Sequence, residues 1–151
     1  MATTNSAELD DFIAKYTAEV AALSHTLFAQ MRTRIPGAVI PVYDNYNALA
    51  IGWGPTDRVK DIVLSLAIMP RWVTLCFTWG IKLDDPHKRL KGSGNQVRSV
   101  QLHQADALVD PQIEALIAQA LALADIAIDP AAQGGIVIKS VSAKQRPRRP
   151  S

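Results

Sequence analysis

The feature that most constrains the fold is a change in hydrophobic period near residue 38. Before it, apolar residues recur at steps of three and four, as on one face of a helix. They are Leu9, Phe12, Ile13, Tyr16, Val20, Leu23, Leu27 and Met31. From residue 38 to about residue 83 the apolar residues instead form four short segments, "VIPVYD", "ALAIGWG", "DIVLSLAIM" and "WVTLCFTWGIKL". The first pattern predicts one long helix that begins near Ser6 and ends before Pro36, and the second predicts strands.

The breaks between these segments are short, which favours antiparallel neighbours because parallel strands need long crossovers. Two further strands are expected at "VRSVQL" and "IVIKSVS", the latter at a sheet edge. Between them, Asp110 is a candidate N-cap and Pro111 a candidate first residue of a second amphipathic helix. The expected fold class is α+β. It would be a two-layer sandwich with an antiparallel sheet of about five to six strands and the N-terminal and C-terminal helices on one face.

The charges divide the chain into an acidic body and a basic end. Residues 1–138 hold 11 basic and all 14 acidic residues, a net charge of −3, whereas residues 139–151 carry +5. We expect one domain over residues 1–142 and a basic, disordered tail over residues 143–151. Two roles for the tail stay open. It is either a solvated terminus or, through Lys144–Arg149, a weak and salt-sensitive contact for nucleic acid or an acidic partner.

Three observations bear on the compartment. Cys76 is the one cysteine, so no disulfide can form within the chain, as is usual in a reducing compartment. The first residues lack the basic and apolar regions of a signal peptide, and no apolar run is long enough to span a membrane. We therefore expect a cytoplasmic protein without a membrane segment, as a monomer or homodimer, with Cys76 as a buried, unreactive thiol.

The run "LDDPHKRLKGSGNQVR", residues 83–98, allows two interpretations. In the structural one, Asp85-Pro86 starts a short helix, Gly92 ends it, and the Ser93–Asn95 turn leads into a strand. In the other, the glycine-containing turn binds an anion through backbone N–H groups, with Lys91, Arg89 and Arg98 supplying positive charge. The spacing matches neither a P-loop nor the dinucleotide-binding glycine pattern.

A ligand cleft is the main functional hypothesis from the residues. The segment "YDNYN" can be a tight hairpin turn, yet it also concentrates adaptable hydrogen-bonding groups around aromatic rings. Trp53 and Trp79 each precede a glycine at a strand end, where they could form the walls of a cleft. The expected site for a small anionic or polar ligand comprises Tyr43, Asn45, Tyr46, Asn47, Trp79, Lys82, Ser93, Asn95 and Arg98. We identify no catalytic residues and no metal ligands, since the three histidines are not at metal spacing.

The stretch "PRWVTLCFTWGIKLDDPHKRLKGSGNQVRSVQL" resembles the core signature of the YdhG-like family, the domain of unknown function 1801. The matching residues are Phe77, Gly80, Leu83, Asp85, Pro86, Leu90, Gly92, Gly94 and Arg98. "VYDNYNALAIGWGPTDR" and "IVIKSVSAKQRPRR" are similar to a bacterial subgroup of that family, so the resemblance covers most of the chain. Arg89 departs from the family pattern, in which a leucine is usual.

The resemblance implies a small α+β sandwich of the frataxin-like type, and some relatives are proposed to be intracellular iron chaperones. The carboxylates of the first helix (Glu8, Asp10, Asp11 and Glu19) are sparse for iron, which prefers clustered carboxylates or histidine. We expect a binding module rather than an enzyme. The alternatives are an iron chaperone, with iron as the one candidate cofactor, and an interaction module that uses its basic tail.

Overall fold

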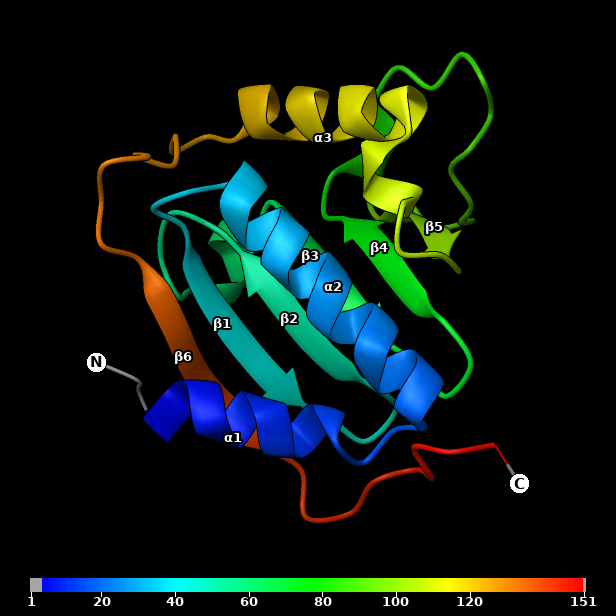
Figure 1. Cartoon of the computed structure of the whole chain (residues 1–151). Helices are drawn as coiled ribbons and strands as arrows, with labels where there is room; N and C mark the ends of the chain where they lie inside the picture. The colour runs from blue at the N-terminus through cyan, green and yellow to red at the C-terminus, as the bar shows by residue number, and fades with distance from the viewer. Residues whose placement is uncertain (1–3, 151) are drawn as a thin grey trace.

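The computed structural model describes residues 4–150 and contains three α-helices and six strands in that range (Figure 1). The helices are α1 (Thr4–Ile13), α2 (Ala18–Arg34) and α3 (Pro111–Leu123). The strands are β1 (Val39–Asp44), β2 (Leu49–Trp53), β3 (Leu64–Ile68), β4 (Val73–Phe77), β5 (Arg98–Leu102) and β6 (Gly135–Val141). Three short 3₁₀ turns, η1 (Val59–Asp61), η2 (Gly80–Lys82) and η3 (Ala107–Val109), lie in the connections.

All six strands form one sheet in the order β5-β4-β3-β2-β1-β6. Strands β1 to β5 are an antiparallel meander, as their short connections predict. The sheet is nevertheless mixed rather than wholly antiparallel, because β6 pairs parallel to β1. The physical reason is the long connection through α3, which brings the chain back to the starting end of the sheet before β6 begins.

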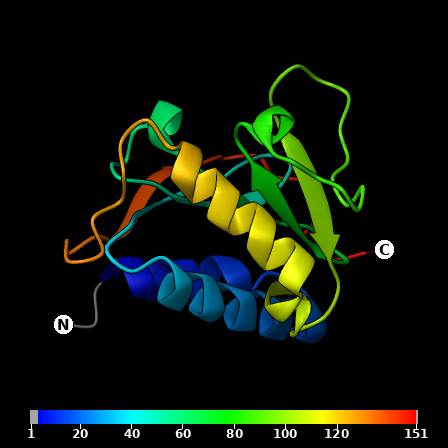
Figure 2. The same cartoon turned by 90° about the horizontal axis from the view of Figure 1, so that it is seen from above.

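One face of the sheet forms the core. Along β1 to β5 alternate side chains face this core, as the period of two requires. These inward residues are Ile40, Val42, Leu49, Ile51, Trp53, Leu64, Leu66, Ile68, Val73, Leu75, Phe77, Val100 and Leu102. Helices α1 and α2 cover this face, and α3 crosses the end of the sheet at which β4 finishes (Figures 1 and 2). The predicted α+β two-layer arrangement is confirmed.

The N-terminal region forms two helices rather than the single long helix expected. The chain leaves α1 after Ile13, and Thr17 begins α2 as its N-cap, with the side-chain oxygen accepting a hydrogen bond from Val20 N. Tyr16, between the two helices, is buried, and its hydroxyl donates to Ile68 O and accepts from Leu49 N. Burial raises the pKa of Tyr16 to about 12. A periodic apolar pattern continues across this break, so the pattern alone did not reveal it.

The start of α3 is as predicted. Asp110 is the N-cap and its carboxylate accepts from Gln112 N, while Pro111 occupies the first turn. The buried side of the helix consists of Ile113, Leu116, Ile117 and Ala120.

The second face of the sheet carries mostly small or polar side chains, among them Ala50, Ser65, Ala67, Thr74 and Cys76, all half-buried. In the described part of the chain no helix covers this face (Figure 2). Cys76 lies in β4, and burial raises the pKa of its thiol, which disfavours the reactive thiolate. None of the helices within residues 4–150 has the length and apolar character needed to cross a membrane.

Replacing Thr17 by alanine should lower the free energy of unfolding by about 1 kcal/mol, because the first turn of α2 loses its side-chain acceptor. Urea denaturation of Thr17→Ala measures this loss. Thr33→Ala, an exposed position near the end of the same helix, is the control and should leave stability within about 0.5 kcal/mol of the parent. Equal losses in the two variants would show that the Thr17 cap adds no stability of its own.

Candidate functional site

The strand register separates the predicted site residues into two groups. Asp44 pairs with Leu49, Leu49 with Ile68, and Ile68 with Val73, so the turn that follows β1 lies level with the start of β4. Phe77, at the other end of β4, pairs with Arg98. The segment Tyr43–Asn47 therefore lies at one end of the sheet, and Trp79, Lys82, Ser93, Asn95 and Arg98 follow the opposite end. The expectation of one cleft containing both groups is wrong.

The first group contacts the basic tail. Tyr46 is 45% exposed, and the guanidinium of Arg146 lies 5.9 Å from the centre of its ring. Asn45 N donates to Ala48 O, which closes the hairpin turn of the structural interpretation. Tyr43 is half-buried, and its buried hydroxyl has no hydrogen-bond partner in the described part of the chain. Asn47 is exposed at the tip of the turn.

Arg98, in the second group, is used by its own loop. Its Nη1 donates to the carbonyl oxygens of Gly94 and Val97, both at 2.8 Å. The backbone of Gly80 packs so closely on Arg98 that a Cβ at Gly80 would lie 2.3 Å from Arg98 Cβ, so only glycine fits there. Ser93 and Asn95 are exposed on the same loop. The anion-binding interpretation of this loop stays a prediction, and Arg98 is already engaged.

The acidic start of the loop attaches it to α3. Asp85 forms a turn rather than the expected helix, and its carboxylate accepts from the backbone N–H groups of Arg89 and Leu90. Arg89 donates to Asp110 Oδ2 at 2.8 Å and to Gln112 Oε1 at 2.9 Å. This anchoring gives a polar role to Arg89, the position that departs from the YdhG-like pattern. The hydrogen bond from Arg89, followed by that from Gln112 N, lowers the pKa of the Asp110 carboxyl.

The Arg89–Asp110 contact should make part of the stability depend on pH. Because the pKa of Asp110 is lower in the folded chain than its ordinary 3.8, the stabilisation is present above that value and is lost as pH falls below it. Asp110→Asn keeps an N-cap but loses the charge. We expect the parent to melt at a higher temperature than Asp110→Asn at pH 7 and the difference to shrink at pH 3, as measured by circular dichroism. Asp106→Asn, an exposed acid nearby, should show no such trend.

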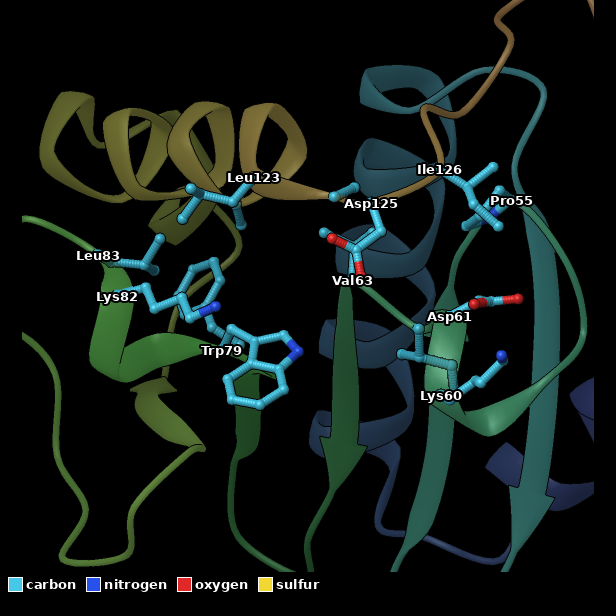
Figure 3. A pocket seen from close by; sticks show the side chains of 14 residues that line it. Pro55, Lys60, Asp61, Val63, Trp79, Lys82, Leu83, Leu123, Asp125 and Ile126 are labelled. Atoms are coloured by element: carbon cyan, nitrogen blue, oxygen red, sulfur yellow. The ribbon is translucent and has the colours of Figure 1, made fainter.

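Trp79 and Lys82 line a pocket at the α3 end of the sheet (Figure 3). Trp79 and Lys82 form one side, and Pro55, Lys60 and Asp61 form the other. Leu123, Asp125 and Ile126, from the end of α3 and the residues after it, complete the wall, and buried Phe77 and Val63 also line it. The pocket volume is about 120 Å³. We call this the Trp79 pocket.

The lining of the Trp79 pocket combines exposed apolar surface with unpaired charge. The residues Trp79, Leu123 and Ile126 are 46%, 48% and 50% exposed. Within residues 4–150, Lys60, Lys82 and Asp125 form no ion pair. The Lys82 ammonium lies 4.6 Å from the centre of the Trp79 ring, which is cation–π distance. Asp61 accepts a hydrogen bond from Thr56 Oγ1 at 2.6 Å.

Only Trp79 and Lys82 of this pocket were expected from the sequence. Lys60 and Asp61 lie in a connection between strands, and Asp125 and Ile126 follow α3, so their positions depend on the packing of α3 across the sheet. The exposed Ile126 directly after an amphipathic helix is the one local signal of an apolar surface there. Trp53, expected as a cleft wall, instead fills the core, with its ring 5.7 Å from that of Phe28.

The basic tail follows a defined path rather than the disordered one expected. Of residues 143–151, Ser151 lies outside the described range. Arg148 is buried, with its side chain 5% exposed, and its Nη2 donates to Asp44 Oδ1 at 2.9 Å. Lys15 Nζ contacts the other oxygen of the same carboxylate at 2.7 Å. The tail is held in this position because the Asp44 carboxylate is fully buried, and a buried carboxylate requires a cationic partner.

Replacing Arg148 by methionine should lower the free energy of unfolding by about 3 kcal/mol, the low end for breaking a buried ion pair, since Lys15 stays beside Asp44. Chemical denaturation gives the value. Arg149→Met is the matched control: Arg149 is exposed, and its Nε donates to the backbone oxygen of Lys15. Its loss should be within about 0.5 kcal/mol. A tail that is only solvated would give the same small effect for both variants.

Comparison with known proteins adds no relative: no protein-family model, curated protein or solved structure matches the chain. The resemblance to the YdhG-like family, and the frataxin-like comparison that follows from it, therefore stay hypotheses. Within the described residues there is no group of three or more His, Cys, Asp or Glu side chains placed to hold a metal ion. The iron alternative stays a prediction with no geometric support among those residues.

Proposed function

We propose that this protein is a binding module for a small anionic or polar ligand, which it takes into the Trp79 pocket. The observation that carries the proposal is the combination, in one concave site, of a half-exposed tryptophan with two lysines that form no ion pair within residues 4–150. Ligand sites are commonly concave and mostly apolar, with a few polar groups that orient the ligand. Trp79 and Lys82 belong to both the site expected from the sequence and the proposed site. The other members of the proposed site are pocket residues at the end of the sheet that α3 crosses.

The geometry narrows the ligand class. The pocket volume of about 120 Å³ lies below the range of about 300–1,000 Å³ that is common for drug-sized ligands, which favours a small ligand or one group of a larger one. The Trp79 face favours a flat or apolar group, and Lys82 and Lys60 favour a carboxylate or phosphate. Asp61 and Asp125 place negative charge in the same lining, which disfavours highly charged anions and favours ligands that also carry a donor or a positive group.

Tryptophan fluorescence tests the proposal. A panel of nucleotides, sugar phosphates and aromatic or aliphatic carboxylates is titrated against the parent protein at fixed ionic strength. We expect at least one ligand to change the emission saturably, and Trp79→Phe to lose that signal, because Trp53 and Trp72 lie outside the pocket lining. Lys82→Met should weaken binding of the same ligand about fivefold or more, as expected for a charge-assisted hydrogen bond worth at least 1 kcal/mol.

The matched control is Lys144→Met, which removes the same charge from the tail at the other end of the sheet and should leave affinity unchanged. A flat response across the panel would contradict the proposal. An unchanged signal in Trp79→Phe would place the ligand elsewhere in the molecule.

A further inference from the structure

The environment of Arg148 engages both terminal nitrogens of its guanidinium group. Its Nη2 donates both to the buried Asp44 carboxylate and to Asn45 O, and its Nη1 lies 3.5 Å from Tyr46 O. The guanidinium carbon is 5.8 Å from the centre of the Tyr16 ring. We call this set of groups, the Asp44 carboxylate, the two carbonyl oxygens and the Tyr16 ring, the Asp44 pocket.

The Asp44 pocket selects arginine over lysine. The pocket offers three acceptor oxygens, those of the Asn45 and Tyr46 carbonyls and of the Asp44 carboxylate. Together they engage both terminal nitrogens of the planar guanidinium group. An ammonium is a compact point charge and lacks the planar fork that addresses such acceptors together. The Tyr16 ring adds a face on which a guanidinium stacks more readily than an ammonium. Lys15, which also pairs with Asp44, approaches the opposite carboxylate oxygen and leaves the arginine position free.

The resident arginine does not saturate its bonds. Arg148 Nε is buried and has no hydrogen-bond partner among the described residues, and leaving a buried donor unpaired costs free energy. The tail around it has no regular secondary structure, and residues 142–150 are held by individual hydrogen bonds from Ser142, Gln145, Arg146 and Arg149. Strand β6 ends at Val141, so withdrawal of the tail leaves every strand pair of the sheet in place.

We propose that the Asp44 pocket is an arginine-recognition site that Arg148 occupies in cis, and that an extended basic peptide with the same Arg-Pro-Arg chemistry occupies it in trans. In the isolated chain the tail acts as a built-in competitor. A short tether gives it an effective concentration on the order of millimolar, so a free peptide must displace it. This site is separate from the Trp79 pocket, which lies at the opposite end of the sheet.

The test uses the full chain with Arg148→Ala and a fluorescent peptide of residues 143–150, "AKQRPRRP". Fluorescence anisotropy should show saturable, one-to-one binding to Arg148→Ala and binding at least about tenfold weaker to the parent, whose own tail competes. Adding Asp44→Asn to Arg148→Ala should abolish binding. Arg149→Ala, which removes an exposed arginine of the same tail, should behave like the parent.

A second peptide separates recognition from simple charge attraction. With lysine in place of the arginine that corresponds to Arg148, the peptide keeps its charge and should bind Arg148→Ala at least about tenfold more weakly. Equal binding of the two peptides would overturn the proposal, because it would reduce the contact to non-specific Coulomb attraction. So would the absence of saturable binding to Arg148→Ala with a circular dichroism spectrum like that of the parent.

Should Arg148→Ala fail to fold, the parent protein decides the question. The backbone N–H of Arg146 donates to Tyr46 O and that of Ser142 to Asp44 O, so their amide signals report on the docked tail. Excess unlabelled peptide should move the Arg146 amide signal in an NMR spectrum towards its random-coil position, while a lysine-only peptide of equal charge should not. No movement at millimolar peptide would overturn the proposal.

Discussion

The burial of one face of the sheet is the constraint on which the rest of the structure depends. Strands β1 to β5 send alternate side chains into the core, so a shift by one residue would expose the core and bury the small polar face. Tyr16, between α1 and α2, holds the two helices against the sheet. Its hydroxyl bonds two backbone groups on adjacent strands, β2 and the end of β3, and thereby fixes the helices over the centre of the sheet. Both proposed sites, the Trp79 pocket and the Asp44 pocket, lie at the ends of the sheet.

Much of the fold could be predicted because local signals and packing agree. The four apolar segments after residue 38 became strands, and Asp110-Pro111 began a helix as their chemistry requires. The break at Thr17 was missed because Leu9, Tyr16 and Val20 maintain a helical period across it, although the two helices point in different directions (Figure 1). The parallel pairing of β6 was also missed, since nothing in "IVIKSVS" indicates the direction in which a strand enters a sheet.

The candidate site was harder to predict for a topological reason. In an antiparallel meander successive connections alternate between the two ends of the sheet, so residues after β1 and residues after β4 lie at opposite ends. Tyr43–Asn47 and the region of Trp79 are both rich in polar and aromatic side chains, but they lie at opposite ends of the sheet. The burial of Arg148 could not be predicted from the neighbouring residues, because its partner Asp44 is 104 residues away. The sequence of the strand that contains Asp44 gives no sign of a buried carboxylate. Composition alone favoured a solvated tail.

The parallel pairing of β6 with β1 has a consequence for how the chain acquires its structure. Strand β1 is synthesised early, yet one of its two neighbours is made only after β2 to β5 and α3, and Arg148 follows later still. If the meander forms before β6 is available, β1 is an exposed edge and Asp44 lacks its guanidinium partner. Strand β6 covers this edge of β1 and completes the sheet.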